Sequence, residues 1–236
     1  MVWLQRQFQV LFSMCIALMI VNCSSPEKGE VSQTAQTFIS LYPAITETIY
    51  HLGAQDQLVG RSDYCTFSTE VQKKPAFGSS LTPNFEAIAR ANPEGLLLDD
   101  SVGNPLADLQ RITTVHQYPW LGTKEMQESI VKLGTLLQKE EEAKQLADKI
   151  SKALSSTAKE TSPRMLVLME GSDFSKGQIW FMRHGSLHGE AIEAAGFRNA
   201  APAEFQGPPQ MSLEQLLQQD PDIILFMTGA QVEFCL

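Results

Sequence analysis

The stretch QMSLEQLLQQDPDIILF, residues 210–226, repeats the pattern of an earlier stretch, LTPNFEAIARANPEGLLLD, residues 81–99. When Glu214 is aligned with Glu86, each stretch has a glutamate, six further residues, a proline, an acidic residue and then an apolar run. Each of the two stretches is typical of a short helix that leads into a buried strand. The repetition predicts two similar units in one chain.

Strand-like and helix-like segments alternate around both stretches. In the first half we expect strands at 37–41, 58–61, 95–99 and near 118, and helices at 44–52, 84–91 and 105–114. In the second half we expect strands at 164–170, 178–181 and 222–227, and helices at 187–195 and 212–219. This alternation predicts an α/β fold in which two similar lobes, residues 37–122 and 162–236, each hold a mostly parallel sheet flanked by helices.

The segment between the lobes has a different pattern. From Lys124 to about Thr157 there is no proline, apolar residues recur at helical spacing, and charges of both signs occupy the other positions. This pattern predicts one long rigid helix of roughly 30 residues, about 45 Å long. We assign it to residues 123–161, because Ser162-Pro163 ends the helical pattern.

The first residues indicate export. Residues 1–22 combine a single charge, Arg6, with an apolar run that is short for a membrane span, as in a signal peptide. Cys23 follows that run and resembles the acceptor of a bacterial lipoprotein signal, with plain secretion as the alternative. Residues 23–36 are small and polar, which suits a tether between a lipid anchor and a folded body. We therefore expect an exported protein on the periplasmic or cell-surface side, anchored to a membrane by lipid.

The repeat also makes a prediction about the second lobe. In the first lobe a helix and a strand are expected between residue 99 and the connecting helix, whereas the sequence ends nine residues after Met227. We therefore expect an incomplete C-terminal lobe, as in a truncated or frameshifted gene product, and poor stability of the isolated chain.

Composition narrows the classes of function. The chain has 18 basic and 27 acidic residues, a formal net charge of −9, which argues against nucleic acid as the partner. No phosphate-binding glycine loop, dinucleotide fingerprint or HExxH motif occurs, and GSLHG has Leu187 where a nucleophile elbow needs serine. The sequence predicts a protein that is not an enzyme and has no cofactor of its own.

The stretches ISLYPAITETIYHLGAQDQLVGRSDYCTF, KKPAFGSSLTPNFEAI and ANPEGLLLD resemble the substrate-binding proteins of ABC importers that have a rigid helical backbone. This family delivers cobalamin, iron–siderophore complexes, haem or metal ions. The resemblance runs from about Phe38 to Met227 and implies a ligand cleft between two lobes. It also implies a membrane permease with a cytoplasmic ATPase as partner, and a monomeric receptor.

The resemblance gives roles to the two aligned glutamates. In the family, each lobe presents a glutamate that contacts arginines of the permease, and these match Glu86 and Glu214. An exposed carboxylate in a helix's first turn can form a charge-assisted, bidentate contact with arginine. The alternative is that the helix dipole alone favours an acid there.

Cleft residues should come from loops at the carboxyl ends of the strands. Aromatic and hydrogen-bonding side chains in those loops suit a large planar or corrin-like ligand. The candidates for ligand binding are Tyr42, Pro43, Tyr64, Phe67, Ser80, Trp180, Arg183, His184 and Phe205.

SDYC followed by an aromatic residue resembles the cobalamin branch, which makes a corrinoid the first choice of cargo. Haem or a ferric siderophore is the alternative, because Arg61, Lys73, Lys74 and Arg183 could bind carboxylates. His184 could be an axial or hydrogen-bonding ligand to a metal macrocycle, and with His188 it could form part of a metal-ion site. A third hypothesis is a surface lipoprotein that binds a ligand or a host surface without delivering a ligand to an importer.

Overall fold

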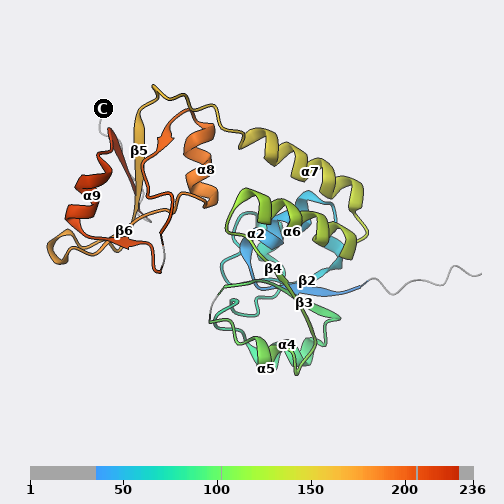
Figure 1. The fold of residues 1–236 in the computed structure, drawn as a ribbon. Helices are drawn as coiled ribbons and strands as arrows, with labels where there is room; N and C mark the ends of the chain where they lie inside the picture. Colours follow the sequence, from blue (N-terminus) through green and yellow to red (C-terminus); the bar gives the residue numbers. More distant parts are fainter. Residues whose placement is uncertain (1–35, 102, 206, 229–236) are drawn as a thin grey trace, which may run out of the picture. The chain divides into compact units, whose positions relative to one another are not determined.

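The computed structural model describes residues 36–101, 103–205 and 207–228, and Figure 1 shows their helices and strands in chain order. The predicted signal peptide, Cys23, most of the tether and the last eight residues lie outside this range. Within the described residues no helix is both long enough and apolar enough to cross a bilayer.

The first sheet has four parallel strands in the order β2-β1-β3-β4. Its strands are β1 (Phe38–Ser40), β2 (Leu58–Gly60), β3 (Gly95–Asp99) and β4 (Thr114–Tyr118). The crossovers contain α2 (Pro43–His51), η1 (Gln55–Gln57), α3 (Thr69–Gln72), α4 (Phe85–Ala91) and α5 (Leu106–Leu109). The predicted alternation of the first lobe is confirmed, although α5 is shorter than the helix expected at 105–114.

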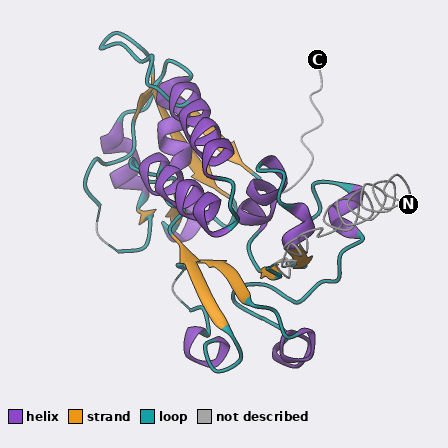
Figure 2. Ribbon diagram, turned by 90° about the vertical axis from the view of Figure 1, so that its right-hand side faces the viewer, coloured by secondary structure: helices purple, strands orange, loops and turns teal. Residues whose placement is uncertain are grey.

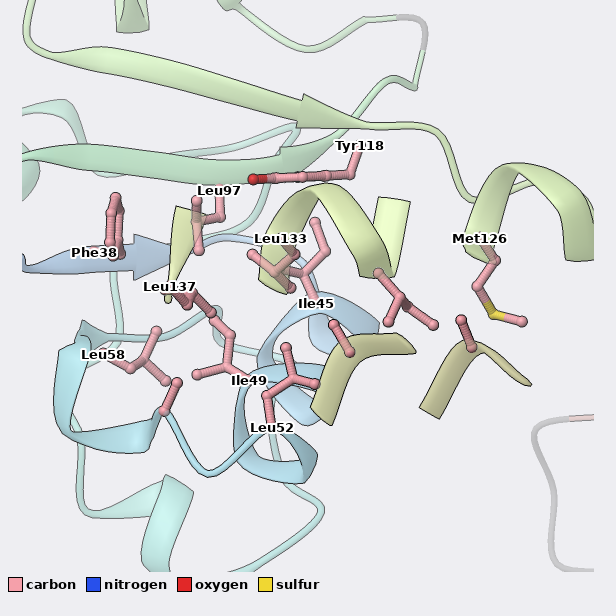
Figure 3. Packing of buried hydrophobic residues seen from close by; sticks show 14 residues of the cluster. Phe38, Ile45, Ile49, Leu52, Leu58, Leu97, Tyr118, Met126, Leu133 and Leu137 are labelled. Carbon is pink, nitrogen blue, oxygen red and sulfur yellow. The ribbon is translucent and has the colours of Figure 1, made fainter. Parts of the chain in front are cut away.

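Both faces of the first sheet are covered. Successive side chains of β3 point to opposite faces, so neighbouring residues of this strand pack against different helices. Leu97 packs with Ile45 and Ile49 of α2, whereas Leu96 and Leu98 pack with Ile88 of α4. Figure 3 shows Ile45 and Ile49 beside Leu133 and Leu137, which follow the last strand of this sheet in the sequence. Burial on both faces explains why β3 is a continuous apolar run.

The second half contains a parallel sheet in the order β7-β5-β9 and an antiparallel pair, β6 with β8. Its strands are β5 (Arg164–Met169), β6 (Ile179–Trp180), β7 (Arg198–Asn199), β8 (Gln210–Met211) and β9 (Ile223–Met227). Its helices are η2 (Phe174–Lys176), α8 (Leu187–Ala194) and α9 (Leu213–Gln219). Figure 2 shows the same helices and strands from another side. The predicted α/β class is therefore correct for both halves.

The prediction of one continuous helix between the sheets is wrong. The structure has two helices there, α6 (Thr123–Leu136) and α7 (Glu140–Ala153), which pack against each other. The chain turns at Gln138, whose φ of 57° is left-handed, and the N–H of Lys139 bonds the carbonyl of Gly134 at 2.7 Å. Gly134 permits the turn, since a Cβ there would lie 2.2 Å from that of Ala143.

Candidate functional site

A pocket of about 270 Å³ lies where the strands of the first sheet end. Leu41, Tyr42 and Pro43 follow β1, and Asp99 and Ser101 stand at the end of β3. Tyr64, Ser79, Ser80 and Leu81, from the connection after β2, complete the lining. Carboxyl ends of parallel strands meet at one edge of a sheet, which is where ligands bind in open α/β folds.

Four predicted ligand-binding residues meet in this pocket, namely Tyr42, Pro43, Tyr64 and Ser80. Tyr64 is 71% exposed and Ser80 is buried, so the pocket has an aromatic rim and a polar inner wall. Pro43 begins α2, where its fixed φ suits the first helical turn, and this start turns the chain away from the strand end. The sequence therefore predicted about half of this pocket.

The structure does not bring Phe67 into the pocket. Its ring packs edge-on against Tyr50 of α2, with ring centroids 5.4 Å apart. Arg61 also has a structural role, because its guanidinium donates hydrogen bonds to the backbone carbonyls of Ser62 at 2.9 Å and Lys74 at 3.1 Å. Lys74 in turn donates to the carbonyl of Leu58 at 2.7 Å. These two basic groups hold the loop after β2 in shape.

The second-half candidates make contacts of other kinds. Phe205 packs edge-on against the fully buried Phe181, with centroids 5.1 Å apart, and belongs to the core around β5. Arg183 donates a hydrogen bond to the carbonyl of Gly207. Trp180, half-buried in β6, bonds Ser172 through its backbone N–H at 2.9 Å. Phe205 thus has a structural role, and Arg183 orders the loop before β8.

His184 lies before α8, whose N-cap is Ser186, so His184 and His188 do not share that helix. The Nε2 atom of His184 lies 3.6 Å from the Oε1 atom of Glu193. Within the described ranges, no three His, Cys, Asp or Glu side chains gather as a metal site would require. The structure therefore gives His184 a carboxylate partner from α8.

Asp99 lines the pocket, although the sequence did not mark it as a candidate for ligand binding. Its side chain is only 4% exposed, at the end of the buried strand β3. The Oγ atom of Ser101 donates to Oδ2 of Asp99, whereas Oδ1 has no hydrogen-bond partner within the described part of the chain. The signal in the sequence was an acid directly after an apolar strand, but sequence cannot show that this acid is buried.

The pKa of Tyr42 depends on its burial and on the acids near this pocket. Burial raises the pKa of its phenol, and the negative charges of Asp99 and then Asp100 raise that pKa further. The phenol is therefore a neutral donor and acceptor at physiological pH. No Lys, Arg or His is among the described residues that line the pocket, whose lining combines apolar side chains and hydroxyl groups with the carboxylate of Asp99.

Cys65 directly follows the pocket residue Tyr64 in the chain. It is fully buried, and its Sγ atom is 3.1 Å from Oγ1 of Thr46, which in turn donates to Oγ of Ser40 at 2.8 Å. Cys235, the other cysteine of the predicted mature chain, lies outside the described residues. The chain of Cys65, Thr46 and Ser40 fixes the backbone at the end of β1, from which Tyr42 projects.

Comparison with known proteins gives a consistent family. The family model described as periplasmic binding protein matches residues 39–233. The high-affinity heme uptake system protein IsdE of Staphylococcus aureus is 24% identical over 217 residues, which cover 88% of this chain and 72% of that protein.

Solved structures share the fold. A possible iron-binding (periplasmic solute-binding) protein from Staphylococcus epidermidis has a TM-score of 0.68 at 22% identity, covering 83% of this chain and 78% of that one. The periplasmic vitamin B12 binding protein BtuF of Vibrio cholerae has a TM-score of 0.64 at 23% identity, with the same two coverages.

Proposed function

The chain belongs to the periplasmic binding protein family and is a substrate-binding protein of the ABC-importer type, and we propose that its cargo is a cobalamin-like corrinoid. In this proposal the protein captures the corrinoid between its two lobes outside the cytoplasm and delivers it to a membrane permease with its ATPase. Tyr42, Pro43, Tyr64 and Ser80 supply the first-lobe contacts, and Cys23 carries the lipid anchor.

The observation that carries the choice of cargo is the charge of the first-lobe pocket. A haem or an anionic siderophore presents carboxylates or comparable anionic groups, which arginine or lysine normally binds. Among the residues that the structure describes, no basic side chain lines the pocket, and the side chains of Arg61 and Lys74 donate hydrogen bonds to backbone carbonyls. A corrinoid has a neutral ring edge bearing primary amides, which tyrosine, serine and carboxylate groups can bind.

Haem is the second candidate, favoured by the similarity to the heme uptake protein IsdE. In that case His184 would leave Glu193 to become an axial ligand, and Arg183 would leave the carbonyl of Gly207 to bind a propionate. A surface lipoprotein that binds its ligand without a permease is the alternative from another class.

The test is an equilibrium titration of the purified protein, followed by intrinsic fluorescence, with cyanocobalamin, haemin and a ferric siderophore. We expect saturable one-to-one binding of cyanocobalamin and much weaker binding of the two anionic probes. Tight binding of haemin alone would replace the corrinoid with haem. Coupling to an importer is tested separately, by corrinoid uptake in cells with and without the permease.

A further inference from the structure

Asp99 combines burial with an incomplete hydrogen-bond set. Its backbone is fixed, because β3 pairs with β1 on one side and β4 on the other, and its carbonyl accepts from Nδ2 of Asn104 at 2.9 Å. Its carboxylate accepts from Ser101 through Oδ2 and has no partner for Oδ1 among the described residues. None of the ion pairs in the described ranges includes Asp99.

Such a group is unfavourable in an empty protein. A carboxylate withdrawn from water without a cation or a full set of donors loses more hydration energy than it regains. Groups of this kind that line a pocket are candidates for a binding role, because a ligand can supply the missing donor. Asp99 meets both conditions, since it is 4% exposed and lines the pocket at the strand ends.

The surroundings decide which ligand group fits. Burial and then the negative charge of Asp99 raise the pKa of Tyr42, with the exposed Asp100 contributing least, so the phenol stays neutral. An anionic ligand group would meet repulsion here, whereas an N–H donor would gain a charge-assisted hydrogen bond.

We propose that the buried carboxylate of Asp99 is a specificity-determining contact that accepts a hydrogen bond from an amide or ammonium N–H of the cargo and rejects carboxylate groups. The inference rests on the proposed function as a cargo receptor. It adds the chemical class of the group that enters the first-lobe pocket, which neither the fold nor the family defines.

The test compares Asp99→Asn with Asp100→Asn. Both variants remove one negative charge from the same strand end, but only the first removes the buried carboxylate, because Asp100 is exposed. We expect Asp99→Asn to weaken cyanocobalamin binding roughly tenfold or more, because a hydrogen bond to a charged group is stronger than one to a neutral group. The same variant should bind haemin several-fold more tightly than the wild type, because the repulsion is gone.

Asp100→Asn should change both dissociation constants by less than about threefold, since exposed charges are screened by salt. Equal effects of the two substitutions, or no effect of Asp99→Asn on either probe, would overturn the inference. If the wild type binds haemin and not cyanocobalamin, the corrinoid proposal fails. The Asp99 inference then stands only if Asp99→Asn alone tightens haemin binding.

A ligand-free measurement decides the case in which neither probe binds. If Asp99 is an unsatisfied charge held for a ligand, the empty Asp99→Asn protein should unfold at a higher urea concentration than the wild type. Asp100→Asn should leave the midpoint unchanged. An equal or lower midpoint for Asp99→Asn would show that its carboxylate is satisfied in the empty protein, and would overturn the proposal.

Discussion

Glu86 and Glu214 are each the second residue of a seven-residue helix that precedes an equivalent strand. Both helices, α4 and α9, have an N-cap side chain that accepts from the third helical N–H, at 3.0 Å for Asn84 and 3.2 Å for Ser212. Both end in a left-handed residue, Asn92 with φ of 47° and Asp220 with φ of 45°. The repeat in the sequence is therefore a repeat in the structure, down to the caps.

The equivalent exposed glutamates lead to a prediction about transport. If both contact permease arginines, Glu86→Arg combined with Glu214→Arg should abolish cargo uptake, because each charge-assisted contact becomes a repulsion. Ligand affinity should stay within about twofold of wild type, since both residues stand apart from the pocket at the strand ends. Uptake by cells and titration of the purified protein measure the two effects. Glu141→Arg, at an exposed position of α7, is the control, and undiminished uptake by the double variant would contradict the assignment.

The helix caps make a second prediction, on stability. Ser212 caps α9 and forms a reciprocal pair with Gln215, whose Oε1 accepts from the Ser212 N–H at 2.8 Å. Ser212→Ala should lower the free energy of unfolding by about 1 kcal/mol, measured by urea denaturation. Ser212→Asp keeps an acceptor at the cap and should restore most of the loss. If alanine and aspartate behave alike, the cap does not contribute to stability.

The segment between the sheets shows where prediction from sequence stopped. Apolar spacing and the absence of proline were compatible with one helix, and α6 and α7 do occupy most of the predicted range. The break is at Leu137 to Lys139, where a non-glycine residue, Gln138, takes a positive φ. That conformation is accompanied by packing of α7 on α6, and helix propensity describes single residues and not the contacts between two helices, so it could not show the turn.

The packing at this turn gives a third prediction. Gly134→Ala would stabilise an isolated helix by about 1 kcal/mol, because glycine is a poor helix former. Here the new Cβ would lie 2.2 Å from Cβ of Ala143 and 2.9 Å from the carbonyl oxygen of Lys139. We therefore expect a loss of about 1–3 kcal/mol in the free energy of unfolding, as for overpacked cores. Ser151→Ala, at an exposed position of α7, is the control and should not destabilise the protein. A stabilised Gly134→Ala protein would mean that α6 and α7 do not pack at this point.

The site was predictable to the extent that it follows from topology. The rule that ligands bind at strand carboxyl ends predicted that Tyr42, Pro43, Tyr64 and Ser80 lie close together, and all four line one pocket. That they bind a ligand there stays a prediction. The same rule could not separate them from Phe67 and Phe205, because an aromatic residue in a loop can pack inward or face a ligand. Asp99 was missed because its burial results from strands on both sides of β3.

His116 supplies a fourth prediction, on pH. Burial lowers the pKa of its imidazole, which lies in β4 with its ring 6.1 Å from that of Phe38. The unfolded chain then binds a proton more readily than the folded protein, so stability is lost as the pH falls below about 6.5. Wild type should lose more stability than His116→Asn between about pH 7.5 and about pH 5.5, measured by urea denaturation. His188→Gln removes an exposed imidazole as the control, and parallel curves for wild type and His116→Asn would refute the assignment.

Strand β9 supplies the last prediction, because its five apolar side chains are all partly exposed, from 36% at Ile223 to 49% at Ile224. It pairs with β5 along one edge, and Leu225 lies opposite the buried Val167. An apolar strand accessible at its edge promotes association between chains. Leu225→Lys should therefore change the free energy of unfolding by less than about 0.5 kcal/mol and reduce association. Sedimentation velocity and urea denaturation measure the two effects.

Leu166→Ala, in the buried strand β5, is the matched comparison and should lower the free energy of unfolding by about 2–5 kcal/mol. If Leu225→Lys is as destabilising as Leu166→Ala, β9 is covered in solution and its apolar residues belong to a core.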